Sequence, residues 1–328
     1  MKCRRNWRMV FLAGWLAVSA ATQAQTCFTG SDMDASTRTA LVNTGQKYFN
    51  FASLGDVASL RQNAIPSLAA NFAGIESAVI ENKPALSGGS ATPRSPFLLK
   101  AEGAKPLERA EFLCGVFGAQ GQTANSAEFV IPNLPPGNYG IVTLDVAAQK
   151  PSTVTFVLQQ QGTDWKLGGF FAKPSQVSGH DGNWFLQQAR SYKAKGQNRI
   201  AWFYYLEARE LLVPVSFMYT QSTDKAYDEM QTVKPSDLPP FDLSGAGKTY
   251  KVMDMFPVVV GSDLDLVVKY QSASVSDTGQ TFQENMAVMK ALLTKYPELR
   301  DAFAGIVARA TEPSGKDYGS LMAMKDIK

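Results

Sequence analysis

Few residues of this chain have the type and spacing that catalysis or metal binding requires. His180 is the only histidine, so the sequence offers no histidine-based metal cluster. It lies in a Ser-Gly-His-Asp-Gly turn before a predicted helix that Asp181 or Asn183 could cap, which indicates a structural or surface role. Asp263 and Asp265 stand two residues apart at the start of a predicted strand, hence on one face. Two carboxylates alone do not make a calcium site.

The string Asp-Leu-Ser-Gly-Ala-Gly-Lys-Thr at 242–249 ends like a phosphate-binding P-loop. That motif requires a buried strand that leads through a glycine-rich turn into a helix whose amides surround the phosphates. Here Asp242 replaces the first glycine, the preceding segment is proline-rich, and Thr249 leads into a predicted strand. The chain also contains no Gly-x-Ser-x-Gly and no Cys-x-x-Cys motif. The sequence therefore predicts no nucleotide site, no metal and no cofactor.

Residues 1–24 have the pattern of a secretory signal peptide, with basic residues, an apolar run and a small-residue end at Ala24, where cleavage is expected. The apolar run is shorter than the roughly 20 residues that a membrane-spanning helix needs. The sequence thus predicts a secreted, periplasmic protein without a transmembrane segment. Loss of the four basic residues and no acidic one would change the formal net charge from +3 to −1. A near-neutral chain has no electrostatic footprint for nucleic acid.

Cys27 and Cys114 are the two cysteines that follow the predicted signal peptide. In an oxidising compartment a disulfide between them would close a loop of roughly 90 residues and stabilise the fold by about 4 kcal/mol. Two unpaired thiols are the alternative. A lipid anchor on Cys27 is disfavoured, because Ala24, Gln25 and Thr26 do not form the Leu-small-small context of a lipobox.

The elements that would position a site begin with helices and continue with strands. Apolar residues at near-helical spacing predict helices over 34–54, 57–63 and 67–81, followed by a Gly/Ser/Pro-rich loop over 83–96. Alternating patterns predict strands at 97–100, 111–117, 128–132 and 139–146. The clearest strand pair is a hairpin over 153–174, in which Trp165 opens the return strand.

Helices followed by an antiparallel sheet whose last strand reads Asp-Trp-Lys-Leu-Gly-Gly-Phe at 164–170 resemble the nuclear-transport-factor-2-like cone, also called SnoaL-like or cystatin-like. Tyr48, Phe49, Gly55 and Asp56 resemble the joint between two helices in that family. The resemblance spans 34–174 and implies a domain over 33–174 whose curved sheet wraps a long helix and leaves a pocket. Such folds bind ligands, catalyse reactions or dimerise, so the fold does not decide the function.

Enzymes of this fold place an acid, often with a tyrosine, in the pocket, where burial raises the carboxyl pKa. The resemblance implies the pocket candidates Tyr48, Asp56, Glu128, Tyr139, Asp145 and Trp165. Each acid also has a simpler interpretation: Asp56 follows Gly55 as an N-cap, while Glu128 and Asp145 lie on a polar strand face. A buried acid facing a tyrosine across an open pocket would indicate an enzyme. A pocket filled by Trp165, Phe170 and Phe171 would indicate binding by surface or a scaffold.

A second resemblance lies within the same region. Residues 129–139, with Asn-Leu-Pro-Pro-Gly at 133–137, resemble a turn of transthyretin-like domains and imply a β-sandwich as the alternative fold. Pro135-Pro136-Gly137 predicts a tight reversal in either case.

Residues 175–231 predict a helical hairpin that resembles a single tetratricopeptide repeat. The positions that carry this resemblance are Phe185, Ala189, Tyr192, Gly196, Ala201, Tyr205 and Ala208. About three repeats are needed for a free-standing solenoid, so this hairpin should dock on its neighbours. The aromatic run at 202–205 is expected in the core and at the domain interface, with a peptide-binding groove as the alternative.

The last third of the chain predicts a linker and a small α+β unit. Residues 232–247 are rich in proline and glycine, and 248–328 have a ββαββ pattern in which Thr281 and Glu284 suggest a capping box. The arrangement as a whole resembles secreted bacterial proteins. We expect an α+β, non-catalytic binding or scaffold protein that holds a small apolar ligand or a protein partner. The alternative is a cofactor-free isomerase, cyclase or hydrolase acting in the cone pocket.

Overall fold

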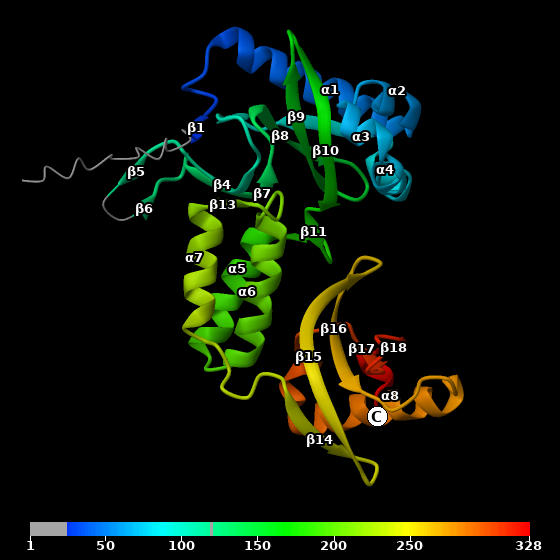
Figure 1. Ribbon diagram of the computed structural model, residues 1–328. Coiled ribbons are helices and arrows are strands. Elements are labelled where there is room, and N and C mark those ends of the chain that lie inside the picture. Colours follow the sequence, from blue (N-terminus) through cyan, green and yellow to red (C-terminus); the bar gives the residue numbers. More distant parts are fainter. Residues whose placement is uncertain (1–24, 119–120) are drawn as a thin grey trace, which may run out of the picture.

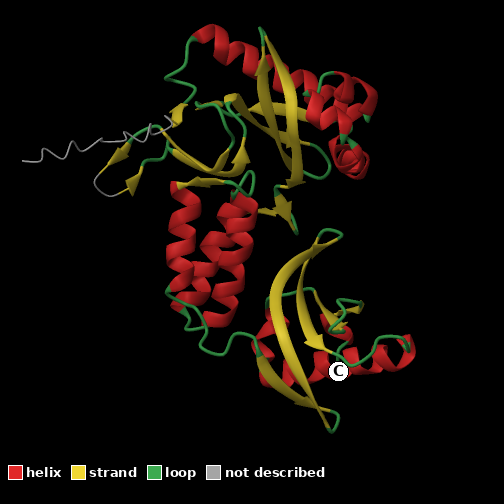
Figure 2. Cartoon of the chain, viewed as in Figure 1, coloured by secondary structure: helices red, strands yellow, loops and turns green. Residues whose placement is uncertain are grey.

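The computed structural model describes residues 25–118 and 121–328. Within these ranges the fold is α+β, with eight α-helices and several sheets whose strands pair antiparallel except for β16 and β17. Three tiers follow one another in Figures 1 and 2: a sheet flanked by helices, a group of upright helices, and a second sheet with its own helix. The predicted signal peptide, 1–24, lies outside the described residues. None of the described helices has the length and apolar character needed to cross a membrane.

Four helices pack on one face of the first sheet (Figure 1): α1 (Ala35–Leu54), α2 (Val57–Gln62), α3 (Pro66–Ala70) and α4 (Ala73–Leu86). The helix predicted over 34–54 is confirmed, because the Asp34 carboxylate caps its first turn and Gly55, at φ 71°, ends it. The prediction of a single helix over 67–81 is wrong, because the helix is interrupted between the end of α3 at Ala70 and the start of α4 at Ala73. Helix α4 also runs into the predicted loop and passes through Pro84. Pro84 has no N–H to donate to the carbonyl of Ile80, one turn earlier in the helix.

The first sheet has the strand order β1 (Gln25–Phe28), β3 (Phe97–Ala101), β8 (Gly137–Ala147), β9 (Ser152–Gln161) and β10 (Asp164–Pro174), with β2 (Ser90–Pro93) also paired to β8. The hairpin predicted over 153–174 is confirmed as β9 and β10, with Gln161 opposite Asp164. The register shifts at Gly168, which forms a β-bulge in the edge strand β10.

Side chains alternate across this sheet, so its two faces have different partners. On the helix face, Tyr48 of α1 packs with Val142, Phe156 and Phe170 in a filled core. The opposite face, called here the outward face, is partly covered by a second sheet of β13 (Met218–Thr220), β7 (Ala127–Leu134) and β4 (Leu107–Cys114). The Pro-Pro-Gly turn carries the chain from β7 in the second sheet to β8 in the first.

A disulfide between Cys27 on β1 and Cys114 on β4 links the two sheets, with their Cα atoms 5.0 Å apart. The two cysteines are separated by 87 positions in the sequence, so the link closes most of the amino-terminal region into one loop. Beyond Cys114 lie the short strands β5 (Phe117–Gly118) and β6 (Gly121–Gln122).

The middle tier contains α5 (Gly182–Ala194), α6 (Asn198–Leu212) and α7 (Gln221–Gln231), preceded by the short strands β11 (Gln176–Val177) and β12 (His180–Asp181). The predicted hairpin corresponds to α5 and α6. Helix α7 was not predicted, because its sequence is mostly polar and its buried apolar residues are only Ala226 and Met230, one turn apart. The connection before it also supplies β13, which pairs with β7 of the second sheet.

The carboxy-terminal sheet has five strands in the order β14 (Phe241–Gly245), β15 (Lys248–Val260), β16 (Asp263–Gln271), β17 (Gly305–Thr311) and β18 (Asp317–Ala323). Helix α8 (Thr278–Lys295) connects β16 to the parallel strand β17, and short 3-10 turns cover Pro297–Asp301 and Met324–Asp326. Strand β14 occupies part of the predicted linker. The predicted capping box is wrong: Asp277 caps α8 by accepting a hydrogen bond from the N–H of Gln280, so Thr281 lies inside the helix.

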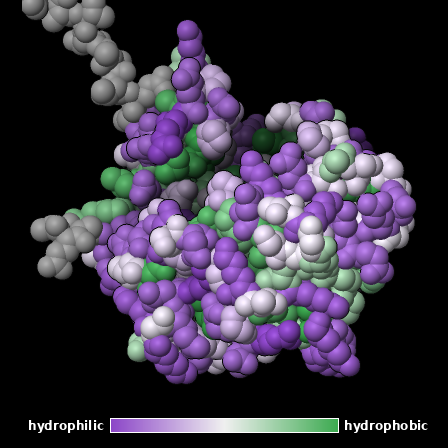
Figure 3. Space-filling view, turned by 90° about the horizontal axis from the view of Figure 1, so that it is seen from below, coloured by the Kyte–Doolittle hydropathy of each residue, from purple (hydrophilic) through white to green (hydrophobic). Residues whose placement is uncertain are grey.

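Helices α5–α7 and the carboxy-terminal sheet share one hydrophobic core. Trp202, Phe203, Tyr204 and Tyr205 are all buried in it, as expected for this aromatic run. The Tyr204 hydroxyl donates a hydrogen bond to the carbonyl of Ala302, at 3.0 Å. Seen from below, hydrophilic residues dominate the surface and hydrophobic ones lie between them (Figure 3), as in a protein exposed to water.

Candidate functional site

Tyr48 and Trp165 belong to the packed helix face of the first sheet. Tyr48 is 1% exposed, and its hydroxyl donates a hydrogen bond of 2.9 Å to the backbone carbonyl of Trp165. Burial raises the pKa of Tyr48 to about 12, so the phenol stays neutral and structural. Trp165 is half-buried against the same core. These two residues tie α1 to the hairpin and line neither of the cavities described below.

Asp56 and Glu128 have the simpler roles that their local sequence suggested. The Asp56 carboxylate caps α2, and its pKa is lowered by the side-chain and backbone hydrogen bonds of Ser59. Glu128 lies on β7 of the second sheet, where it pairs in register with Leu113 and Tyr219. Neither acid hydrogen-bonds to Tyr48, whose hydroxyl donates to the backbone carbonyls of Trp165 and Asn63.

Tyr139 and Asp145 share strand β8 and its outward face but line different cavities. The Tyr139 hydroxyl donates to the carbonyl of Pro135, at 2.7 Å, and accepts from Nε2 of Gln159, at 3.2 Å. Asp145 accepts two hydrogen bonds from Arg94, of 2.6 and 2.9 Å. The six candidates therefore do not converge, and no two of them form an acid–tyrosine pair across a cavity.

The other candidate residues do not assemble a reactive centre either. His180 stacks on Trp184, with ring centroids 3.7 Å apart and planes 7° apart. Asp265 is 4% exposed, and burial followed by the charge of Asp263 raises its pKa. Within residues 25–118 and 121–328, no group of three or more His, Cys, Asp and Glu side chains could hold a metal ion.

An apolar cleft of about 500 Å³ opens on the outward face, beside the edge strand β10. Its floor is Val157 and Gln159 of β9 and the glycine pair Gly168-Gly169 of β10, and Phe171 forms part of its rim. Phe171 is 41% exposed and meets Phe217 edge-on, with ring centroids 5.6 Å apart. The wall opposite includes Ile131, Leu134 and Pro135 from the end of β7, and Ile65 and Ser67 from the start of α3.

The β-bulge leaves room in this cleft. A Cβ atom built on Gly168 would lie 3.4 Å from the nearest atom, the carbonyl oxygen of Val157, which is an ordinary contact. Two successive positions without side chains therefore leave part of the floor uncovered. The polar groups of the cleft are few: the Tyr139–Gln159 pair and the hydroxyl of Ser67. Burial raises the pKa of Tyr139, so its hydroxyl acts as a neutral hydrogen-bonding group near pH 7.

Sequence reasoning named Tyr139 as a candidate for the cone pocket and Phe171 as a ring that could fill that pocket, and it missed Phe217 and Gly168. The doublets Gly168-Gly169 and Phe170-Phe171 were the available signals. In a strand, Phe170 and Phe171 must point to opposite faces, so one of them had to leave the helix-side core. Nothing in the local pattern indicated that Phe217, 46 positions further along the chain, would meet Phe171.

Comparisons with protein-family models, with curated proteins and with solved structures gave no significant match. The resemblances to the nuclear-transport-factor-2-like cone and to a tetratricopeptide repeat therefore remain predictions.

Proposed function

We propose that this protein is a non-catalytic binding protein that holds a small, mainly apolar ligand in the cleft beside β10. The observation that carries the proposal is the partly exposed Phe171, which meets Phe217 at the rim of a cleft with bare glycine backbone in its floor. Ligand pockets are typically concave and apolar, with a few polar groups that fix orientation. The Tyr139–Gln159 pair offers such a group.

The chemistry of the lining favours binding over catalysis. The described residues that line the cleft include no acid, no histidine and no cationic side chain. The alternative of an isomerase, cyclase or hydrolase would need a general acid or base within hydrogen-bond reach of its substrate. A neutral tyrosine and an amide can orient a ligand by one or two hydrogen bonds. We therefore expect the ligand to be uncharged, with one polar group.

The cellular setting in this proposal follows from the predicted signal peptide. A protein exported to the periplasm or beyond would meet its ligand outside the cytoplasm, where a disulfide such as Cys27–Cys114 can persist. Capture or transport of an apolar compound in that compartment is the role we assign to it.

Native mass spectrometry of the protein isolated from its secreted fraction is the first test. A mass above that of the denatured chain would reveal a bound small molecule, and fragmentation would give its class. Affinity is then measured by titration with the neutral fluorophore N-phenylnaphthylamine. Gly168→Leu should fill the cleft without backbone strain, because Gly168 does not have a positive φ.

We expect Gly168→Leu to weaken fluorophore binding at least about tenfold, while Gly168→Ala, the matched control, leaves most of the cleft open and most of the affinity intact. Thermal unfolding of both variants would establish that they are folded. Equal affinity of the wild type and a folded Gly168→Leu variant would refute the assignment of the cleft.

A further inference from the structure

A second cavity, here called the polar hollow, lies between the outward face of the first sheet and the helical tier. Its volume is about 710 Å³, within the range of pockets that hold small molecules, and it shares no lining residue with the apolar cleft. Strands β8 and β9 contribute Asp145 and Thr153, which are opposite each other in register. The amino-terminal ends of α5 and α7 contribute Asn183 and Thr220.

Thr153 is the residue that points to a ligand. It is 2% exposed, yet its hydroxyl makes no hydrogen bond with any described residue. Two positions along the same strand, Thr155 is also buried, and its hydroxyl bonds to that of Thr143 at 3.1 Å. The fully buried side-chain atoms without a partner do not include this hydroxyl, so its oxygen is accessible from the hollow, where water or a ligand can hydrogen-bond to it. A hydrogen-bond partner for the Thr153 hydroxyl must therefore come from the hollow that this residue lines.

The charges around the hollow nearly cancel. Arg94 is engaged by Asp145 through two hydrogen bonds, and Asp181 caps α5 by accepting from the N–H of Trp184 at 2.9 Å. Each helix amino terminus adds about half a positive elementary charge. One arginine and two helix ends thus balance two carboxylates. Such a site favours a neutral ligand over an anion or a cation.

Further lining side chains are hydroxyls and amides that remain available. Ser95, Gln176 and Asn183 line the hollow, and their side chains form no hydrogen bond within the described part of the chain. Phe97 and Met218 add a small apolar patch. Many separate donors and acceptors, little net charge and an apolar patch match a molecule that carries several hydroxyl groups and presents C–H faces between them.

We propose that the polar hollow is a binding site for a neutral polyhydroxylated small molecule of the size of a sugar or a disaccharide. The Thr153 hydroxyl and the Asn183 amide hydrogen-bond to ligand hydroxyls, and the Arg94–Asp145 pair presents its remaining lone pairs and N–H groups to them. This site is independent of the apolar cleft, so either assignment can fail without the other.

Saturation-transfer NMR and calorimetric titration of the whole protein test the site with three neutral probes: maltose, cellobiose and diacetylchitobiose. Galacturonate is the charged comparison. The variants are Thr153→Val, which keeps the shape of the side chain, and Asn183→Ala, at an exposed position that folding should tolerate. Thr155→Val is the matched control on the same strand, because Thr155 does not line the hollow.

We expect at least one neutral probe to bind saturably, and Thr153→Val and Asn183→Ala each to weaken it about tenfold, as loss of one ligand hydrogen bond predicts. Thr155→Val should leave the affinity unchanged. Three outcomes would overturn the proposal: no saturable binding of any neutral probe up to roughly 10 mM, stronger binding of galacturonate than of every neutral probe, or affinity that neither lining variant alters.

Discussion

Glu207, on helix α6, is a carboxylate that the fold removes from water. It is 3% exposed, and its Oε1 atom has no hydrogen-bond partner among the described residues. Burial raises its pKa to about 7, the charge of Glu210 adds to the shift, and Lys173 of β10 opposes it. A buried carboxyl without a full set of partners is more stable protonated than charged.

The titration of Glu207 predicts a pH dependence of stability. Because the folded pKa lies above the ordinary value of 4.5, the protonated folded state is favoured. The stabilisation that comes from protonated Glu207 is fully present below about pH 4.5 and is lost as the pH rises through about 7. Glu207→Gln should therefore raise the free energy of unfolding at about pH 8 by roughly 2–3 kcal/mol, and change it little near pH 5.

Urea unfolding of wild type and Glu207→Gln at these two pH values measures this effect. Glu81→Gln is the control, because Glu81 is exposed on α4 and does not contribute to the pKa shift of Glu207. An equal effect of Glu207→Gln at both pH values would contradict the raised pKa.

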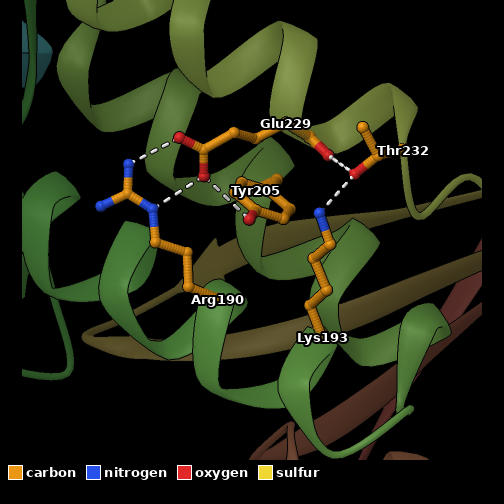
Figure 4. Close-up of polar contacts among 5 residues, drawn as sticks. All are labelled: Arg190, Lys193, Tyr205, Glu229 and Thr232. Atoms are coloured by element: carbon orange, nitrogen blue, oxygen red, sulfur yellow. Dashed lines mark hydrogen bonds and ion pairs between the residues drawn. The ribbon is translucent and has the colours of Figure 1, made fainter.

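At the scale of elements, one carboxylate joins the three helices of the middle tier (Figure 4). Glu229 of α7 accepts two hydrogen bonds of 2.7 Å from Arg190 of α5 and one of 3.0 Å from the Tyr205 hydroxyl of α6. Lys193 of α5 adds a bond of 2.8 Å to the hydroxyl of Thr232, just beyond α7. These contacts fix the position of α7, whose own sequence contributes little apolar surface.

Glu229→Gln should loosen this helix contact. The hydrogen bonds from Arg190 are the main cause of the lowered pKa of Glu229, so the carboxylate stabilises the fold above about pH 4.5 and loses that effect as the pH falls through its folded pKa. We expect the variant to lose about 1–2 kcal/mol at neutral pH, and less at acidic pH. Thermal unfolding measures the loss. Asp228→Asn, at the adjacent exposed position, should have little effect. A similar loss in both variants would argue against a specific role of Glu229.

At the scale of the whole molecule, the described residues form three hydrophobic cores. One core contains the helix face of the first sheet, another joins the two amino-terminal sheets, and the third combines α5–α7 with the carboxy-terminal sheet. Phe203 of α6, for example, meets Phe303 before β17, with ring centroids 5.8 Å apart. The helical tier and the last sheet therefore depend on each other.

This dependence predicts how fragments fold. A fragment of residues 175–231 would expose Phe203, Tyr204 and Ile200 to water, so we expect little helix by far-ultraviolet circular dichroism. A fragment of residues 175–328 retains the whole shared core and should be helical and unfold cooperatively. A stable, protease-resistant 175–231 fragment would show that the helices fold without the sheet.

The sequence by itself determined features that depend on neighbouring residues. Helix α1 and the hairpin of β9 and β10 could be predicted because their caps, turns and apolar periodicity are local, and the roles of Asp56 as a cap and of residues 202–205 as core were visible in the same way. Helix α7 was missed because long-range contacts, such as that with Arg190, stabilise a segment whose own pattern is weak. Strand β14 pairs with the next strand, β15, across a two-residue turn, and it was assigned to the linker because of the proline and glycine content of 232–247.

Only the tertiary structure decided where ligands could bind. Alternation along β8 and β9 shows that the sheet has two faces, but not which elements cover each one. Helices α1–α4 fill one face, so Tyr48 became a core residue and Trp165 packs against the same core. The other face is partly covered by strands and helix ends that come from distant parts of the chain. Phe171 meets Phe217 there, and Thr153 faces the ends of α5 and α7. Cavities form where surfaces from distant parts of the chain pack incompletely against each other. No local sequence pattern predicts where that happens.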